Sequence, residues 1–309
     1  MSEKAVGIIG KGMIGISEAV LFTGNGIPVI VLAKEAEKGL ERYRAYYQDL
    51  IAAGLVTEKQ AEACERLLSF TESYEDLADV NIVFECVSEN TEVKRQVYQK
   101  IEKYCPQLTA IASTTSALSP EELARGAAHP EKILVAHPIN PPHMVLCVEL
   151  VKNDFTSPEA QKAVTDLLEA CGREVCVLNK AVPGFIFNRL QHALYREAVH
   201  IVEEGVCTPK TIDKCIGTAM APRYTAIGLF DHFDYAGLDL AASIGEYLYP
   251  ELCNDTDVSQ YIAERVARGD LGYKSGVGIY DWRSRDMDAF RKKTAKPFQK
   301  FFNWKLPEA

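Results

Sequence analysis

The chain has 309 residues, 47% of them hydrophobic, and a formal net charge of −9. This length predicts more than one domain, and the acidic balance argues against nucleic acid as a partner, because phosphate binding requires a basic surface. No apolar run reaches the ~20 residues that span a membrane, and nine cysteines without a C-x-x-C pair argue against disulfides and structural zinc, so we expect a cytoplasmic protein without membrane contact or metal.

The first half of the chain alternates short apolar runs with helical patterns. Strands are predicted at KAVGIIG (4–10), 28–33, 81–86, 110–113, 133–137 and 147–151. Helices are predicted at 12–25, from 35 to about 70, at 92–104 and at 119–127. This alternation is typical of an α/β fold, a Rossmann-type doubly wound and mainly parallel sheet with helices on both faces.

After Val182 the pattern becomes wholly helical. An amphipathic helix is predicted at 183–205, and further helices at 208–219, 237–249 and 257–268. We therefore place a domain boundary near residue 182, with an α/β domain at 1–182 and an all-α domain at 183–309. The aromatic tail KPFQKFFNWKLPEA is expected to lie against a surface.

Three glycines directly after the first predicted strand form the pattern G-x-G-x-x-G. Gly10 permits a tight turn, Gly12 lets a pyrophosphate approach the backbone, and Gly15 lets the following helix pack on the strand. A dinucleotide would then sit at the helix N-terminus, beside Met13 and Ile14. A purely structural glycine turn is the alternative.

The acid that usually follows the second strand and binds the ribose of NAD is missing. Ala33 stands at that place and Lys34 follows it. Lys34 could attract the 2′-phosphate of NADP, whereas Glu35 or Glu37 could serve NAD instead. The sequence leaves NAD and NADP both open.

His137 and Glu149 lie on two apolar runs on either side of the loop PINPPHMVLCV. If these runs form a hairpin centred on residue 143, the two side chains are cross-strand neighbours with Cβ atoms ~5 Å apart. A carboxylate at that distance orients the imidazole as a general base. An unrelated His and Glu at the loop edges is the alternative.

Two further motifs extend this set. IASTTSALSP places Ser116 in a group of hydroxyls at a strand end, and GFIFNRLQ places Asn188 on the first helix of the second domain. With VFECVSEN, AHPINPPHMVLCVELV, GVCTPKTIDKCIG and LGYKSGVGIYDW, the arrangement resembles the L-3-hydroxyacyl-CoA dehydrogenase family along nearly the whole chain.

The resemblance implies an NAD(P)-dependent dehydrogenase that transfers a hydride between nicotinamide and the C3 carbon of its substrate. It implies that His137 is the base and that Glu149 orients it. Ser116 and Asn188 would bind the C3 oxygen and the neighbouring carbonyl, and Glu85 and Lys94 would lie beside the cofactor. It also implies a homodimer formed through the helical domain and a place in fatty acid metabolism.

The substrate stays open between two classes. HPINPP departs from the H-F-F-N-P of members that act on CoA esters, and it is similar to the branch with L-gulonate 3-dehydrogenase and lambda-crystallin, and to carnitine dehydrogenases. For a free 3-hydroxy acid, Arg223 is the candidate carboxylate ligand, although it could instead make a structural ion pair. The segment 35–70, where relatives bind CoA, has cations among many acids, and GYKSGVGIYDW is similar to 3-hydroxybutyryl-CoA enzymes. A crystallin-like protein without activity is a third possibility.

Overall fold

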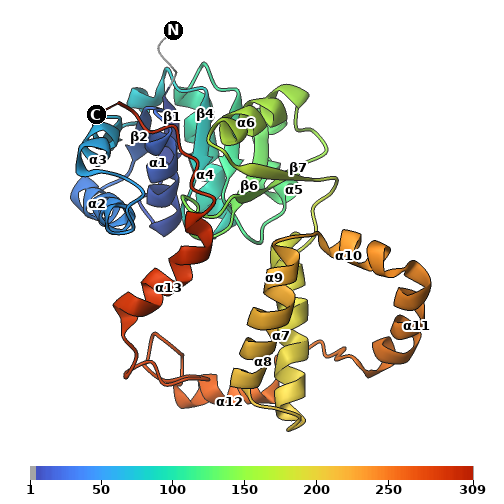
Figure 1. Ribbon diagram of the computed structural model, residues 1–309. Coiled ribbons are helices and arrows are strands. Elements are labelled where there is room, and N and C mark those ends of the chain that lie inside the picture. Colours follow the sequence, from blue (N-terminus) through green and yellow to red (C-terminus); the bar gives the residue numbers. More distant parts are fainter. Residues whose placement is uncertain (1–4, 309) are drawn as a thin grey trace. The chain divides into compact units, whose positions relative to one another are not determined.

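The computed structural model describes residues 5–308 and divides the chain into two units (Figure 1). The first unit comprises residues 1–186 together with 288–309, and the second comprises residues 187–287. Among the described residues, none of the helices combines the length and the hydropathy that a membrane span would need.

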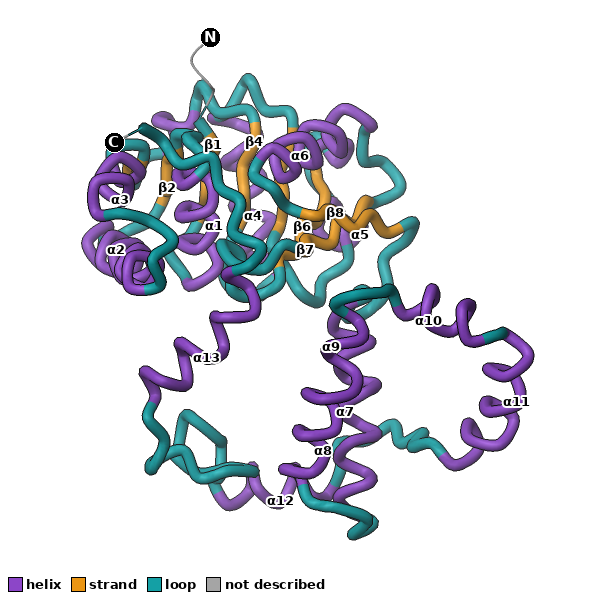
Figure 2. The backbone as a smooth tube through the Cα atoms, in the orientation of Figure 1, coloured by secondary structure: helices purple, strands orange, loops and turns teal. Residues whose placement is uncertain are grey.

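An eight-stranded sheet forms the centre of the first unit (Figure 2). Its strands are β1 (Val6–Ile9), β2 (Val29–Leu32), β3 (Leu68–Thr71), β4 (Ile82–Glu85), β5 (Ala110–Ser113), β6 (Ile133–Pro138), β7 (Cys147–Lys152) and β8 (Glu174–Leu178). The spatial order is β3-β2-β1-β4-β5-β6-β7-β8, and every pair is parallel except β6 and β7. The chain order reverses between β1 and β4, which is where doubly wound sheets bind ligands. The predicted fold class is confirmed.

Helices cover both faces of this sheet because its central strands are apolar on both sides. β1, β4 and β5 are buried along their whole length. One face packs against α1 (Met13–Gly24), α2 (Ala36–Ala52), α3 (Glu58–Glu65) and α6 (Pro158–Ala170). The other packs against η1 (Tyr74–Leu77), α4 (Thr91–Tyr104) and α5 (Pro120–Ala124). A short 3-10 turn, η2 (Pro130–Lys132), precedes β6.

Two edge strands differ from the expectation. The helix predicted from 35 to about 70 is two helices followed by β3, and β8 was not predicted. Both strands are only partly buried and have polar residues within them. Edge strands need not be apolar on both faces, so their sequences carry a weaker strand signal.

The second unit is helical, as predicted. It contains α7 (Phe187–Glu203), α8 (Pro209–Cys215), the π-helical turn η3 (Ile216–Met220), α9 (Ala221–Tyr224), α10 (Leu229–Ala236), α11 (Leu238–Leu248), η4 (Tyr249–Glu251) and α12 (Gln260–Arg268). Helix α8 begins where the Thr208 hydroxyl accepts the backbone N–H of Thr211, with Pro209 at the first helical position. Helix α10 was not predicted.

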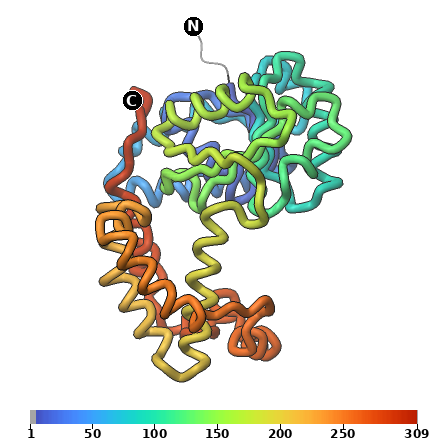
Figure 3. The backbone as a smooth tube through the Cα atoms, turned by 90° about the vertical axis from the view of Figure 1, so that its right-hand side faces the viewer, coloured from blue at the N-terminus to red at the C-terminus, as the bar shows by residue number. Residues whose placement is uncertain are grey.

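The C-terminal segment returns to the first unit, which corrects the assignment of residues 183–309 to one helical domain. After α13 (Met287–Gln299) the chain packs on the α1–α2 side of the sheet (Figure 3). Trp304 is buried there, with its ring 4.6 Å from that of Phe302, and the backbone N–H of Lys305 donates to Asn25 at 3.0 Å. The aromatic tail therefore completes the core of the α/β unit.

Candidate active site

The glycine turn packs tightly against the rest of the protein at Gly10 and Gly15, whereas Gly12 faces open space. Gly10 has a φ of 116°, and a Cβ there would lie 2.6 Å from the carbonyl oxygen of Cys86, just after β4. A Cβ on Gly15 would lie 2.2 Å from the Gly10 oxygen, whereas nothing described lies within 4 Å of the corresponding point on Gly12. Gly12 is also the N-cap of α1, with Met13 half exposed after it. This cradle at a helix N-terminus suits the pyrophosphate of a dinucleotide.

Lys11, within the glycine turn, reaches the residues that follow β2. Its ammonium donates to the Lys34 carbonyl oxygen at 2.5 Å and to the Glu35 carboxylate at 2.8 Å, and Lys38 binds the other Glu35 oxygen at 2.7 Å. These two cations lower the pKa of Glu35. Glu35, one of the two acids that could serve the ribose of NAD, is therefore held beside the glycine turn. Its backbone is left-handed, with a φ of 54°.

Glu85 and Lys94 form a buried ion pair at the end of β4. The Lys94 ammonium lies 2.8 and 3.0 Å from the two Glu85 oxygens, and that carboxylate also accepts from Tyr98 and Ser113. Both members of the pair are almost fully sealed from solvent. Groups so buried would support the surface beside a cofactor, and the placement of Glu85 and Lys94 next to the cofactor stays a prediction.

Glu89 is the residue at this strand end that the sequence analysis missed. One carboxylate oxygen accepts the backbone N–H of Ser116 at 3.1 Å and the Thr115 hydroxyl, and the other lies 3.3 Å from the Lys94 ammonium. Its side chain is 40% exposed. Glu89 thus ties the hydroxyl loop after β5 to the buried pair below it. The signal was present, since VFECVSEN has a second acid four residues after the strand.

The structure pairs His137 with Glu149 as the hairpin hypothesis predicted. The two residues are directly opposite each other in β6 and β7, and His137 Nδ1 lies 2.7 Å from Glu149 Oε2. Both are buried. A carboxylate at Nδ1 fixes the proton on that nitrogen and leaves the lone pair on Nε2, the arrangement of a general base.

The segment after Pro183 holds this pair from the side. Glu149 Oε1 accepts the backbone N–H of Ile186 at 2.7 Å, and the Phe185 ring lies 5.5 Å from the His137 ring. Phe185 has a φ of 48°, which is rare for an aromatic residue and costs on the order of 1–3 kcal/mol. That strain is offset by the burial of Phe185 against the imidazole.

The loop between β6 and β7 is fixed by Ser17 of α1 and by Arg173, the residue before β8. The Ser17 hydroxyl lies 2.6 Å from His143 Nδ1 and accepts the His143 backbone N–H at 3.1 Å. Burial, with the nearby Arg173, lowers the pKa of His143 to about 4. Arg173 donates to the carbonyl oxygens of Pro142 and Val145 at 3.4 and 3.0 Å. These contacts set the geometry of the hairpin that holds His137 and Glu149.

Asn188 and Arg223 belong to the second unit. Asn188 lies in the first turn of α7, two residues after Ile186 in the sequence. Arg223, in α9, has its guanidinium 3.2 Å from His232 Nε2. The first unit alone therefore brings together the glycine cradle, the Ser116 loop and the His137–Glu149 pair, each at one or more strand ends of the sheet.

Comparison with known proteins agrees with this arrangement. Residues 5–181 match the family model for 3-hydroxyacyl-CoA dehydrogenase, NAD binding domain, and residues 184–282 match that for 3-hydroxyacyl-CoA dehydrogenase, C-terminal domain.

Individual relatives differ in substrate. The chain is 30% identical to a 5-formyl-3-hydroxy-2-methylpyridine 4-carboxylate 5-dehydrogenase of Mesorhizobium japonicum over 94% of each chain. A crystal structure of an enzyme of that name, described as an NAD+ dependent dismutase, covers 96% of this chain and 97% of its own with a TM-score of 0.85 and 29% identity. An L-carnitine dehydrogenase of Oceanobacillus iheyensis is 31% identical over 76% of each chain. The structure of (S)-3-hydroxybutyryl-CoA dehydrogenase PaaH1 from Ralstonia eutropha has a TM-score of 0.74 and 28% identity, covering 92% of this chain and all of its own.

Proposed function

The chain belongs to the 3-hydroxyacyl-CoA dehydrogenase family of NAD-dependent dehydrogenases that act on CH–OH groups, and we propose that its substrate is a free 3-hydroxy acid. The observation that carries the reaction is the buried pair of His137 and Glu149. The substrate class rests on separate observations in the segment from 35 to 70.

In the proposed mechanism, His137 Nε2 accepts the proton of the substrate's hydroxyl as the alcohol becomes a ketone. Glu149 stabilises the imidazolium that forms, and its second oxygen, held by the Ile186 N–H, keeps the carboxylate from turning away. Ser116 and Asn188 bind the C3 oxygen and the neighbouring carbonyl. When bound, NAD supplies the hydride acceptor for this chemistry.

The cations of segment 35–70 favour a free acid over a CoA ester. CoA needs cations that are available to its phosphates. Three of the five cations in this segment are engaged within the protein, namely Arg44 with Glu65 (2.9 and 2.5 Å), Arg42 with the Lys11 carbonyl oxygen (2.8 Å) and Lys38 with Glu35 (2.7 Å). The relatives named for a pyridine carboxylate and for carnitine act on compounds without CoA by their names. We propose that Arg223 binds the carboxylate of the acid.

For the cofactor, Glu35 supports NAD over NADP. Its carboxylate lies after β2, linked by Lys11 to the glycine turn. Each Glu35 oxygen accepts one ammonium hydrogen bond and keeps a second lone pair, which can accept from a ribose hydroxyl. Lys34 offers its backbone oxygen to Lys11 and its side chain is exposed, so its role as a ligand for a 2′-phosphate stays a prediction.

A substrate panel tests the proposal. The purified chain is assayed by nicotinamide absorbance with L-gulonate, carnitine, 3-hydroxybutyrate and 3-hydroxybutyryl-CoA, each with NAD and NADP, and with His137→Ala as the blank. We expect one of the free acids to have the highest kcat/KM, with NAD. Preference for the CoA ester would overturn the substrate class and favour a role in fatty acid metabolism. Turnover unchanged in His137→Ala would overturn the mechanism, and no turnover of any compound would favour a crystallin-like protein.

We also propose that the chain forms a homodimer through its second unit. Large aromatic side chains on α10 and α11 are highly exposed, among them Phe230 at 87%, Tyr235 at 90% and Tyr247 at 81%. Exposed apolar side chains that gather on neighbouring helices are typical of interaction surfaces. Light scattering should give a dimer mass that Tyr235→Lys with Tyr247→Lys reduces to a monomer. A monomeric wild type at micromolar concentration would contradict the proposal.

A further inference from the structure

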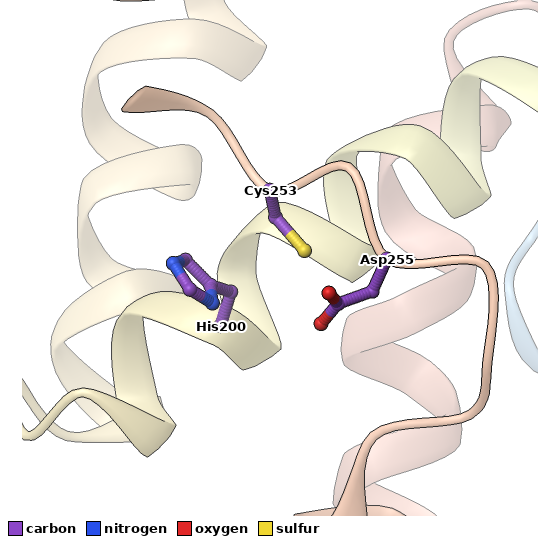
Figure 4. A group of neighbouring side chains, drawn as sticks. All are labelled: His200, Cys253 and Asp255. Carbon is purple, nitrogen blue, oxygen red and sulfur yellow. The ribbon is translucent and has the colours of Figure 1, made fainter. Parts of the chain in front are cut away.

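Three side chains of different metal-binding chemistry converge in the second unit, where the sequence predicted no metal. His200 lies in the last turn of α7, and Cys253 and Asp255 lie in the loop between η4 and α12 (Figure 4). One ligand atom from each lies within 4.8 Å of the other two. We propose that these three residues form a binding site for a divalent transition metal of the zinc class, with water as the fourth ligand.

Helix α7 holds the loop in this position through groups one turn before His200. Glu197 accepts the backbone N–H of Cys253 at 2.8 Å, and Arg196 donates to the backbone oxygen of Asp255 at 3.0 Å. Residues three and four positions apart lie on one face of a helix. The two loop residues are thus fastened by their backbones. Figure 4 shows the Asp255 carboxylate directed toward the imidazole and the Cys253 thiol directed into the space beside that carboxylate.

A third hydrogen bond from α7 holds the end of this loop, where α12 begins. Glu203, also in α7, accepts the backbone N–H of Tyr261 at 2.7 Å. An open depression lies beside it, lined by Glu203 and residues 254–260, and gives solvent access to Asp255. The acids around this depression, including Asp257, favour the approach of a cation.

The donor set selects the metal. Imidazole nitrogen, thiolate sulfur and carboxylate oxygen bind Zn²⁺ at about 2.0–2.3 Å, so tetrahedral ligands are about 3.4–3.6 Å apart. The three ligand atoms lie within 4.8 Å of one another, so each pair has at most about 1.4 Å to close on binding. Sulfur and nitrogen disfavour Ca²⁺ and Mg²⁺. On binding, the Cys253 thiol loses its proton to solvent, and the thiolate and the Asp255 carboxylate together balance the ion's two charges.

Cobalt is the probe for this site, because thiolate ligation to Co²⁺ gives a charge-transfer band. The full-length chain is reduced, stripped of metal with a chelator and titrated with Co²⁺. We expect one equivalent to bind with that band and with the intense visible absorption of tetrahedral cobalt, and Zn²⁺ to displace it. Cys253→Ser should abolish the charge-transfer band, and His200→Gln and Asp255→Asn should each weaken binding at least tenfold. Zn²⁺ should raise the melting temperature of the wild type and not that of Cys253→Ser.

Matched variants separate this site from other ligands of the same type. Cys215→Ser and His192→Gln should both keep the band and the affinity. The thiols of Cys147 and Cys176, 3.7 Å apart in the first unit, offer a competing pair, so Cys176→Ser is included. Circular dichroism establishes that each variant is folded. The proposal is overturned if no band appears at micromolar metal, if Cys253→Ser keeps it, or if Cys176→Ser removes it.

Discussion

Glu18 gives a prediction whose size follows from the structure. It lies in α1, three residues after Gly15, and is buried with its Oε2 lacking a hydrogen-bond partner in the described part of the chain. Burial raises its pKa from 4.5 to about 8, although the Arg173 charge opposes that rise. We predict that Glu18→Gln removes a loss of stability that the wild type shows between pH 6.5 and 8.

The direction and size follow from proton linkage. A carboxyl whose pKa is raised in the folded state stabilises the fold below pH 4.5, and this contribution is lost as the pH rises through about 8. His143 acts oppositely, because its pKa falls from 6.5 to about 4 and its stabilisation is lost as the pH falls through that range. The two effects cancel between pH 4.5 and 6.5. From pH 6.5 to 8 Glu18 acts alone, and 1.5 pH units at about 1.36 kcal/mol per unit give about 2 kcal/mol.

Urea unfolding at pH 5, 6.5 and 8 measures this difference. The wild type should lose about 2 kcal/mol of unfolding free energy from these groups between pH 6.5 and 8, whereas Glu18→Gln should not. His143→Gln should extend the wild-type decline down to pH 4.5. Glu37→Gln, an exposed acid on α2, is the control and should follow the wild type. The reasoning is refuted if Glu18→Gln and the wild type decline in parallel above pH 6.5.

Three further predictions concern the cofactor, the chemistry and the tail. His137→Gln should lower kcat by about 10²–10⁴-fold with NAD affinity unchanged, as measured by steady-state kinetics and cofactor titration; a loss confined to NAD binding would contradict its role. Glu35→Gln should reduce the preference for NAD over NADP about tenfold in kcat/KM, and an unchanged ratio would show that another group sets it. Trp304→Ala should cost about 3–5 kcal/mol in urea unfolding, whereas the more exposed Phe301→Ala should cost much less; equal losses would contradict a tail that completes the core.

The features predictable from the sequence are those that depend on local spacing. The glycine cradle follows from three positions between one strand and one helix. The facing of His137 and Glu149 follows from a hairpin, because the register of an antiparallel pair is fixed once its centre is known. The entry helix of the second unit follows from its amphipathic period. In each case the residues that act together are close in the sequence, or, for His137 and Glu149, lie at equal distances from the centre of one hairpin.

The features that were missed depend on contacts between distant segments. Glu89 binds the backbone of Ser116, 27 residues away, and Trp304, in a tail expected only to lie against a surface, packs on Gly24 and Tyr47. Neither contact leaves a periodic pattern in the sequence. The burial of Glu85 was also invisible, since an acid at a strand end has the same sequence signature whether it faces a ligand or a buried lysine.

The orientation of the candidate base depends on both kinds of contact. The strand register alone places Glu149 opposite His137. A carboxylate held through only one of its oxygens can still rotate, and the imidazole bound to it would rotate as well. The backbone N–H of Ile186 engages that second oxygen, and it can do so because Gly184 and Phe185, both at positive φ, turn the chain back toward β7. The strained backbone at Phe185 therefore has a specific consequence: it fixes the carboxylate, which fixes the proton on Nδ1 and leaves Nε2 as the basic nitrogen. A hairpin with the same two residues, but without the positive φ angles at Gly184 and Phe185, would keep His137 and Glu149 opposite each other. It would not fix the orientation of the carboxylate or the position of the imidazole proton.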